Sequence, residues 1–396
     1  MADRAGSDQA VWRVEGNPLV RGTPGGPLTG TTVAVKDLYA VAGQRIGAGN
    51  PTWLAGAPVE ESNAWAIDAL LAAGADIAGL AQTDEFAYSL SGTNVHYGTP
   101  PNPASPGHIP GGSSNGPASA VALGLADVGL GSDTAGSIRI PASYCGLLGF
   151  RPTHAAVSTT GLLPLAPSFD TVAWLARDAA TLARVGDVLL PQACATPLTV
   201  GLLADDLLAL ADPEVAAAVE SAGRSLVGPT VRSIPSLCEG NLDAWRAAFR
   251  AVQGAQAWRA NGPWITEHPG ALGPGIADRF AQASRVRPEQ EDRAADILRS
   301  AARALADRIP PGTAILLPAA SSTAPAAQLS ADRKEAIRSG TVALTCLASL
   351  AGLPAAVLAR LDVQGGPVGL CAIAGPGQDR ALLDLAVGQA ATTPTR

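Results

Sequence analysis

Residues 111–139 read GGSSNGPASAVALGLADVGLGSDTAGSIR, and this stretch determines how the rest of the chain is interpreted. It contains two turns rich in small residues, 111–116 and 131–137, separated by an Ala-rich segment and an apolar run. We expect a helix over 117–125 and a strand over 127–131. Turns built from small residues let backbone N–H groups point outward, which suits an anion or a developing oxyanion.

The rest of the chain repeats this alternation of strand-like and helix-like segments. The other expected strands are 31–36, 76–80, 198–203, 314–317, 355–360 and 367–373. The other expected helices are 63–73, 178–190, 213–226, 241–260, 288–308, 335–350 and 380–389. Strands separated by helices predict an α/β fold: a single large domain with a mixed, mostly parallel β-sheet covered by helices. The Gly-, Pro- and Ser-rich segment 92–117 is too irregular for a core element, and loops of this length are usually functional.

Composition indicates a globular protein with a large core. Of its 396 residues 47% are hydrophobic and 15% are charged, and the net charge is -7. A mild acidic excess offers no electrostatic footprint for phosphates, so we expect a small-molecule substrate and no nucleic-acid partner. Gly352 and Pro354 interrupt the uncharged stretch 341–359, and the segment 1–16 has no apolar run, so we expect no membrane segment and no targeting signal. The scattered cysteines predict buried thiols and a cytoplasmic location: Cys145, Cys194, Cys238, Cys346 and Cys371.

Lysine is rare in this chain, because only Lys36 and Lys334 occur among its 27 basic residues. Arginine does not release its proton near neutral pH, whereas a buried lysine can, so an amine base must be one of these two. Lys334 lies in the charged run DRKE over 332–335, which is typical of a solvated helix start. Lys36 follows the strand-like run over 31–35 and precedes Asp37. The simplest alternative for Lys36 is a surface charge at the end of a strand.

Three kinds of chemistry compete for the two turns. A phosphate cradle does not fit, since no lysine follows the glycines and neither turn has the Gly-x-Gly-x-x-Gly pattern. A nucleophile elbow centred on Ser114 needs a strand directly before it, and the proline-containing segment 103–110 cannot be a central strand. The third possibility needs no histidine: a neutral lysine activates a serine, directly or through a second hydroxyl. Lys36, one serine of the first turn and Ser137 would supply the groups.

The residues that carry this chemistry resemble a known family. The run from Gly111 to Ser137, continuing through 139–142 and 149–153, resembles the amidase signature family, whose members hydrolyse the C–N bond of amides. Residues 33–37 are similar to the lysine motif of that family. Further similar segments extend the resemblance over nearly the whole chain: 98–103, 163–166, 351–354 and 367–370. Within the family, 84–89 and 141–146 are most similar to indole-acetamide hydrolases.

Carried over position by position, the resemblance implies a Ser-Ser-Lys triad. Ser137 takes the position of the nucleophile, Ser113 that of a bridging serine held after a cis peptide bond, and Lys36 that of the base. The oxyanion hole falls on backbone N–H groups of a turn with these residues: Thr134, Ala135, Gly136 and Ser137. Supporting roles, as anchors of the turn, are expected for three further residues: Ser114, Asp133 and Arg139. The resemblance implies no cofactor and no metal.

Two departures from the family pattern affect the expected geometry. Ala135 and Asn115 stand where the family usually has glycine, and a methyl group at position 135 excludes the most glycine-specific backbone angles. The mechanism also sets a condition on Lys36, which must be neutral in the resting enzyme. Burial would have to lower the pKa of its amine from about 10.4 to about 7.

The resemblance implies one amidase domain over 1–396. Catalytic-core motifs would lie in 25–180, a more variable helical region that shapes the substrate pocket in 195–330, and a return to the core sheet in 335–390. The expected reaction converts a small carboxylic amide to an acid plus ammonia or an amine through an acyl-enzyme, with an arylacetamide such as indole-acetamide as a candidate substrate and a homodimer as a candidate assembly.

Two other functions are compatible with the sequence. One is the amidase-like subunit of a tRNA-dependent amidotransferase, which passes ammonia to a partner protein. The other is a non-catalytic docking relative, although Lys36, Ser113 and Ser137 are all retained. Activity of the purified chain without a partner would separate these alternatives.

Overall fold

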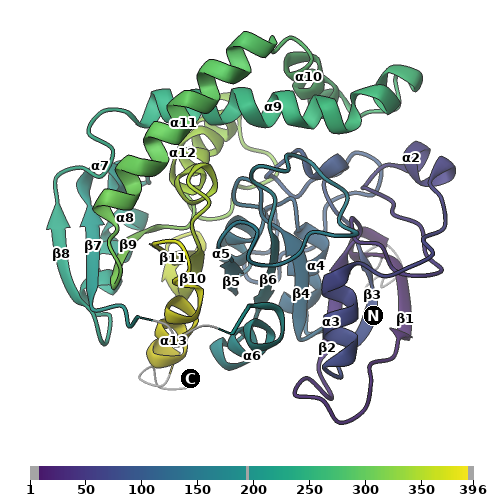
Figure 1. The fold of residues 1–396 in the computed structure, drawn as a ribbon, viewed down its shortest axis with the longest axis horizontal. Coiled ribbons are helices and arrows are strands. Elements are labelled where there is room, and N and C mark those ends of the chain that lie inside the picture. The colour runs from purple at the N-terminus through teal and green to yellow at the C-terminus, as the bar shows by residue number, and fades with distance from the viewer. Residues whose placement is uncertain (1–8, 193–195, 391–396) are drawn as a thin grey trace.

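The computed structural model describes residues 9–192 and 196–390, and within them one large mixed sheet organises the chain. Its strand order is β1-β3-β2-β4-β6-β5-β10-β11-β9-β7-β8 (Figure 1). The strands are β1 (Trp12–Val20), β2 (Thr32–Lys36), β3 (Asp76–Ala81), β4 (Val128–Ser132), β5 (Leu148–Arg151), β6 (Val172–Ala176), β7 (Val200–Ala204), β8 (Thr230–Ile234), β9 (Thr313–Pro318), β10 (Ala355–Val363) and β11 (Gly366–Ala374). The single large α/β domain with a mixed sheet is therefore confirmed.

The expectation that the sheet is mostly parallel is wrong. Among the described strands the neighbouring pairs β2·β3, β2·β4, β7·β8 and β7·β9 are parallel, and the remaining six pairs are antiparallel. The antiparallel strands occupy the centre of the sheet, where β10 and β11 form a hairpin closed by Gln364 and Gly365. Two residues are too few for the crossover that a parallel pair requires.

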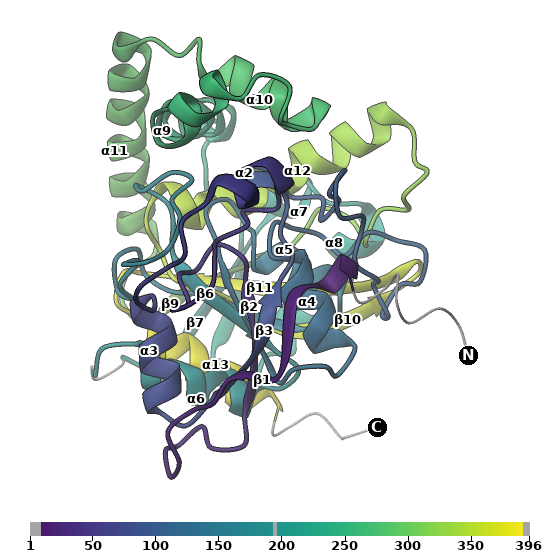
Figure 2. The same ribbon diagram turned by 90° about the vertical axis from the view of Figure 1, so that its right-hand side faces the viewer.

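Helices cover both faces of the sheet (Figures 1 and 2). They are α2 (Pro51–Gly56), α3 (Trp65–Ala72), the 3₁₀ turn η1 (Glu85–Ala87), α4 (Asn115–Ala122), α5 (Arg139–Tyr144), α6 (Ala179–Leu189), α7 (Asp205–Leu208), α8 (Pro213–Arg224), α9 (Leu242–Glu267), α10 (Pro274–Ala283), α11 (Pro288–Arg308), α12 (Ala331–Leu350) and α13 (Asp379–Ala390). Every helix expected from the sequence is present, whereas α2, α5, α7 and α10 were not predicted. The segment 92–114 is irregular, as expected.

Alternate residues of each strand divide the core into two layers. Val33 and Val35 belong to the buried cluster on the face covered by α3, α6, α8 and α13, whereas Ala34 belongs to the cluster on the opposite face, covered by α4, α5, α9 and α12. Since successive side chains of a strand point to opposite faces, a sheet buried on both sides needs apolar residues at both. Burial on both faces explains why the strands read as continuous apolar runs.

The cysteines follow the sequence-based expectation where they are described. Cys145, Cys238, Cys346 and Cys371 are buried free thiols, and Cys194 lies outside the described residues. In the same described ranges, no helix combines the length and the apolar character that crossing a bilayer requires.

Candidate active site

The site lies where three neighbouring parallel strands end. Strands β3, β2 and β4 are adjacent and parallel, with Val35 opposite Leu130. Lys36 is the last residue of β2, Ser132 is the last residue of β4, and Asp84 follows β3. In α/β sheets, ligands bind outside the carboxyl ends of parallel strands. Topology therefore brings an amine and a hydroxyl together at the strand ends, and the loop after β3 adds a carboxylate.

A continuous hydrogen-bonded path joins the three residues of the expected triad. The Nζ atom of Lys36 lies 2.8 Å from Oγ of Ser113, which lies 3.0 Å from Oγ of Ser137. All three side chains are buried, and the peptide bond between Gly112 and Ser113 is cis. The carbonyl of Ser113 accepts hydrogen bonds from Thr83, through its Oγ1 atom at 3.0 Å, and from the backbone of Asp84. The middle serine is thus held at its backbone as well as at its hydroxyl.

The amine of Lys36 has the environment of a neutral base. It has no exposed surface, and burial lowers its pKa from 10.5 to about 7, although nearby carboxylates, above all Asp84, act in the opposite direction. Burial also raises the pKa of Asp84 to about 6. Loss of hydration disfavours the charged form of each group, which explains why the two pKa values move toward one another.

A buried ion pair anchors the turn that carries Ser137. The Asp133 carboxylate accepts hydrogen bonds from Nε and Nη2 of Arg139, at 3.0 and 2.8 Å. It also accepts backbone N–H groups from Gly136 at 2.8 Å and Ile138 at 3.1 Å. Asp133 thereby fixes both sides of the nucleophile turn. This is the anchoring arrangement expected for Asp133 and Arg139.

The expected oxyanion hole needs one correction. The N–H of Gly136 is already bonded to Asp133, so it is not available to a ligand. In the described ranges, the N–H groups of Thr134, Ala135 and Ser137 have no hydrogen-bond acceptor, and these three residues line a cavity. The turn therefore offers three free donors rather than four. The sequence could not reveal this, because the acceptor of each N–H depends on how the turn folds back on Asp133.

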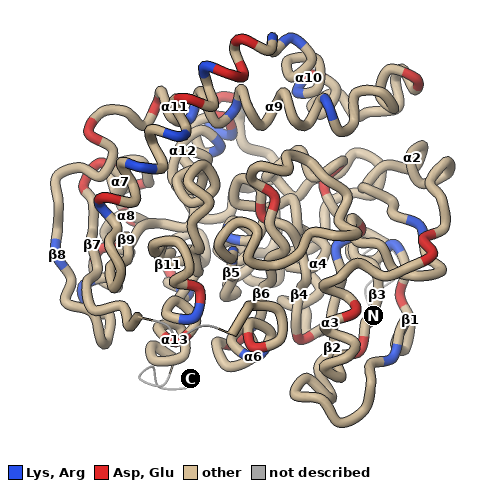
Figure 3. Tube along the Cα trace, in the orientation of Figure 1, with Lys and Arg blue, Asp and Glu red and all other residues tan. Residues whose placement is uncertain are grey.

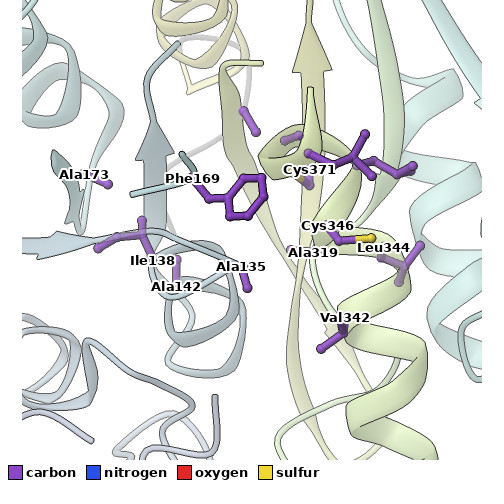
Figure 4. Close-up of a cluster of buried hydrophobic side chains, with 14 of the residues drawn as sticks. Ala135, Ile138, Ala142, Phe169, Ala173, Ala319, Val342, Leu344, Cys346 and Cys371 are labelled. Atoms are coloured by element: carbon purple, nitrogen blue, oxygen red, sulfur yellow. The ribbon is translucent and has the colours of Figure 1, made fainter. Parts of the chain in front are cut away.

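The departures from the family pattern fit the turn. The positive φ of this turn, 124°, is at Gly136, so Ala135 does not need a glycine-specific conformation. Its methyl group lies in an apolar cluster with Phe169 and Val342 (Figure 4). Asn115 donates from Nδ2 to the carbonyl of Gly92 at 3.2 Å and so ties α4 to the irregular segment.

Ser114 is hydrogen-bonded locally and does not join the path. Its Oγ donates to the carbonyl of Ser132 at 3.3 Å, and its N–H donates to the carbonyl of Ser137 at 3.3 Å. The residue thereby links the two turns of the motif.

A cavity of about 500 Å³ opens onto Ser137. This volume lies within the range of roughly 300–1,000 Å³ that is typical of small-molecule sites. Its floor includes Thr134, Ala135 and Ser137, and its walls come from 87–90, α9, α10 and α12. Figures 1 and 2 show α9 and α10 above the edge of the layer that holds these residues. The sequence predicts that residues 195–330 form the substrate pocket. In the structure, α12 and residues 87–90 also line the cavity.

Sequence reasoning missed three polar residues of the site. Oγ of Ser132 lies 2.9 Å from Nζ of Lys36 and gives the amine a second hydroxyl partner. Asp84 is a buried carboxylate beside the amine, and Asp170 accepts a hydrogen bond from Oγ1 of Thr134 at 2.6 Å. Ser132 could have been found, because parallel strands that end together put the residue after the expected strand 127–131 beside Lys36. No comparable signal marks Asp170.

Comparison with known proteins adds independent information. The family model described as Amidase matches residues 7–250. "Amidase 1" of Arabidopsis thaliana is 37% identical over 390 residues, covering 90% of this chain and 92% of the plant protein. A solved structure described as "Crystal structure of amidase" superimposes with a TM-score of 0.83 at 29% identity, covering 93% of this chain and 86% of that chain. A glutamyl-tRNA(Gln) amidotransferase chain of Methanothermobacter thermautotrophicus is 51% identical, but over only 31% of this chain and 27% of its own length.

Proposed function

Because the chain belongs to the amidase family and is an enzyme acting on C–N bonds, we propose that it hydrolyses small carboxylic amides through a Ser-Ser-Lys relay. The observation that carries the proposal is the buried path of hydrogen bonds from Lys36 through Ser113 to Ser137, which ends at a cavity.

In the first half-reaction, neutral Lys36 takes the proton of Ser113 while Ser113 takes that of Ser137. Oγ of Ser137 then attacks the amide carbonyl and forms a tetrahedral intermediate. The negative oxygen is stabilised by free backbone N–H groups of the turn, an effect worth about 3–4 kcal/mol for one donor in comparable sites. The protonated relay returns a proton to the leaving nitrogen, the C–N bond breaks, and an acyl-enzyme remains.

In the second half-reaction, water attacks the acyl-enzyme. Its proton passes through the Ser113 hydroxyl to Lys36, and when the tetrahedral intermediate collapses the proton returns through Ser113 to Oγ of Ser137, which releases the acid and restores the Ser137 hydroxyl. Ser132 has a specific part in this scheme. A neutral amine donates N–H and accepts through one lone pair, so donation to Ser132 leaves the lone pair directed at Ser113.

An arylacetamide remains a candidate substrate. Tyr88 and Phe249 line the cavity and offer aromatic contact surface to a flat acyl group. The amidotransferase alternative has weaker support, since the sequence match to the Methanothermobacter protein extends over 31% of this chain, whereas the match to the plant "Amidase 1" extends over 90%. A docking role would not require the intact path from Lys36 to Ser137.

The test is ammonia release from a panel of small primary amides, including arylacetamides, by the purified chain without a partner. Ser137→Ala and Lys36→Arg should each lower kcat/KM by about 10³-fold or more, because the first removes the nucleophile and the second cannot supply a neutral base. Ser225→Ala, at an exposed serine outside both cavities, is the matched control for Ser137→Ala and should retain activity. Unchanged hydrolysis by Ser137→Ala or Lys36→Arg would contradict the mechanism.

A further inference from the structure

Two cavities meet at a cluster of charged side chains beyond Ser137. The cavity that opens onto Ser137 adjoins a second of about 420 Å³, and both are lined by Leu90, Arg279, Glu335 and Arg338. Arg279 and Arg338 therefore lie where the two cavities meet, and the two cavities together are called the groove below.

The charged residues that line this groove carry a net positive charge, although the chain as a whole carries -7. The cationic residues are Arg250, Arg279, Lys334 and Arg338, and the anionic ones are Asp278 and Glu335. Figure 3 shows basic and acidic segments along α9, α10, α11 and α12. A groove with this balance attracts a negatively charged small molecule.

Among the described residues Arg279 makes no direct ion pair, although Asp84 and Glu335 are near enough to interact with it electrostatically. Glu335 is engaged by Arg338, whose Nε and Nη2 lie 2.7 and 2.6 Å from its two carboxylate oxygens. Arg279 donates from Nη1 to the carbonyl of Tyr88, and no carboxylate of the described residues lies within 4.0 Å of its guanidinium. Burial, and then the positive charge of Arg338, lower the pKa of Arg279, although the nearby carboxylates of Asp84 and Glu335 act in the opposite direction.

A carboxylate is the group that best satisfies such a guanidinium. Arginine presents paired N–H donors that match the two oxygens of a carboxylate, and the charged hydrogen bonds are about twice as strong as neutral ones. The bound anion would also offset the repulsion from Arg338. Arg279 and Ser137 line the same cavity, so one small molecule can reach both.

We propose that the substrate carries a carboxylate in addition to the scissile amide, and that Arg279 binds this carboxylate while Ser137 attacks the amide. The inference rests on the proposed hydrolase function. The carboxylate belongs either to the acyl part, as in the monoamide of a dicarboxylic acid, or to the amine part, as in an N-acyl amino acid. Neutral amides, arylacetamides included, are then poorer substrates than their carboxylated counterparts.

The experiment compares two matched pairs of amides. Succinamic acid against butanamide tests a carboxylate on the acyl side, and N-acetylglycine against N-ethylacetamide tests one on the amine side. We expect kcat/KM to favour the anionic member of one pair, and Arg279→Gln to lower that preference by about tenfold or more. Arg279→Lys should retain part of the preference, and Arg303→Gln, at an exposed arginine of α11 outside both cavities, should leave it intact.

A binding measurement separates failure of this inference from failure of the hydrolase proposal. Calorimetry on Ser137→Ala compares the affinities for the same four amides without turnover. Tighter binding of an anionic member that is lost in the double variant with Arg279→Gln supports the inference, even if the wild-type chain hydrolyses none of them. Equal hydrolysis or equal binding within both pairs, or a preference that survives Arg279→Gln, overturns it.

Discussion

Asp133 is the position at which a nearly isosteric replacement should destabilise the protein severely. Its carboxylate has no exposed surface and lies between two buried guanidinium groups, those of Arg139 and Arg151. Burial alone would raise the pKa of Asp133, but these two arginines hold it well below its usual range. The charge therefore stabilises the fold at neutral pH, and its contribution is lost only as the pH falls below the ordinary aspartate value of 3.8.

Asp133→Asn keeps the shape of the side chain but removes the charge. One acceptor oxygen becomes an N–H₂ group that faces other donors, and Arg139 loses its counter-ion. Breaking one partner of a buried ion pair costs about 3–5 kcal/mol, a factor of roughly 150 to 5,000 in the folding equilibrium. A loss of this size is a large fraction of a typical stability of about 5–15 kcal/mol.

The assay is urea unfolding at pH 7.5 followed by far-UV circular dichroism. The matched control is Asp243→Asn, whose carboxylate pairs with Arg246 but is 87% exposed, so its loss should change the free energy of unfolding by less than about 1 kcal/mol. A destabilisation by Asp133→Asn no larger than that of the control would refute the assignment of the Asp133 cluster as the anchor of the turn.

Three further predictions concern the relay and its turn. The first concerns pH. Since the pKa of Lys36 is about 7, kcat/KM should fall about tenfold per pH unit below pH 7, because the amine becomes protonated, and it should be constant above pH 7. A flat profile between pH 5.5 and 8 would contradict a lysine base. Ser132→Ala removes an acceptor from the Lys36 amine and should lower kcat/KM by about ten- to a hundredfold, whereas a change within about twofold would rule out its proposed part. Gly136→Ala places a Cβ 2.8 Å from Ile140 at a φ of 124° and should lower the free energy of unfolding by about 1–3 kcal/mol. Gly124→Ala, with positive φ but open space around it, is the control in the same unfolding assay, and an equal loss in both variants would exclude the steric argument.

The regular elements of the fold were largely accessible from the sequence. The helix 288–308 has the predicted bounds, because Pro288 starts it and its apolar residues recur at helical spacing. The strands 314–317 and 355–360 were predicted from short apolar runs. The missed strand β1 contains Gly16 and Pro18, which suit an edge strand but conceal it among loops. The strands β5, β6 and β8 were also missed. Runs of four or five residues carry little periodicity, so strands of this length are identified only in some cases, as β2, β4 and β7 were.

The pairing direction of the central strands could have been deduced. The runs 355–360 and 367–373 were predicted as strands, and the few residues between them include Gly365, which has a φ of 95°. So short a connection excludes a helical crossover and indicates a hairpin. The alternation of strands and helices elsewhere favours a parallel sheet, but the short connection between these two runs is the more specific signal.

The site residues that lie within a recognisable sequence motif could be predicted, and those outside such a motif could not. Lys36, Ser113 and Ser137 come from distant segments but stand in recognisable small-residue or strand-end contexts. Asp170 and Arg279 reach the site only through tertiary packing, from a loop and from α10, and neither has a distinctive neighbourhood in the sequence. Cavity walls are set by helix packing, which sequence periodicity does not specify.

The charge of Lys36 can be measured directly, because the chain has only two lysines. Selective labelling of lysine with ¹⁵N gives one side-chain signal from buried Lys36 and one from exposed Lys334, and replacement of Lys334 by arginine assigns them. We predict that the Nζ chemical shift of Lys36 changes from that of an ammonium to that of an amine with a midpoint at about pH 7. An ammonium signal for Lys36 that persists to about pH 10, as in an unperturbed lysine, would leave the relay without a base and contradict the account.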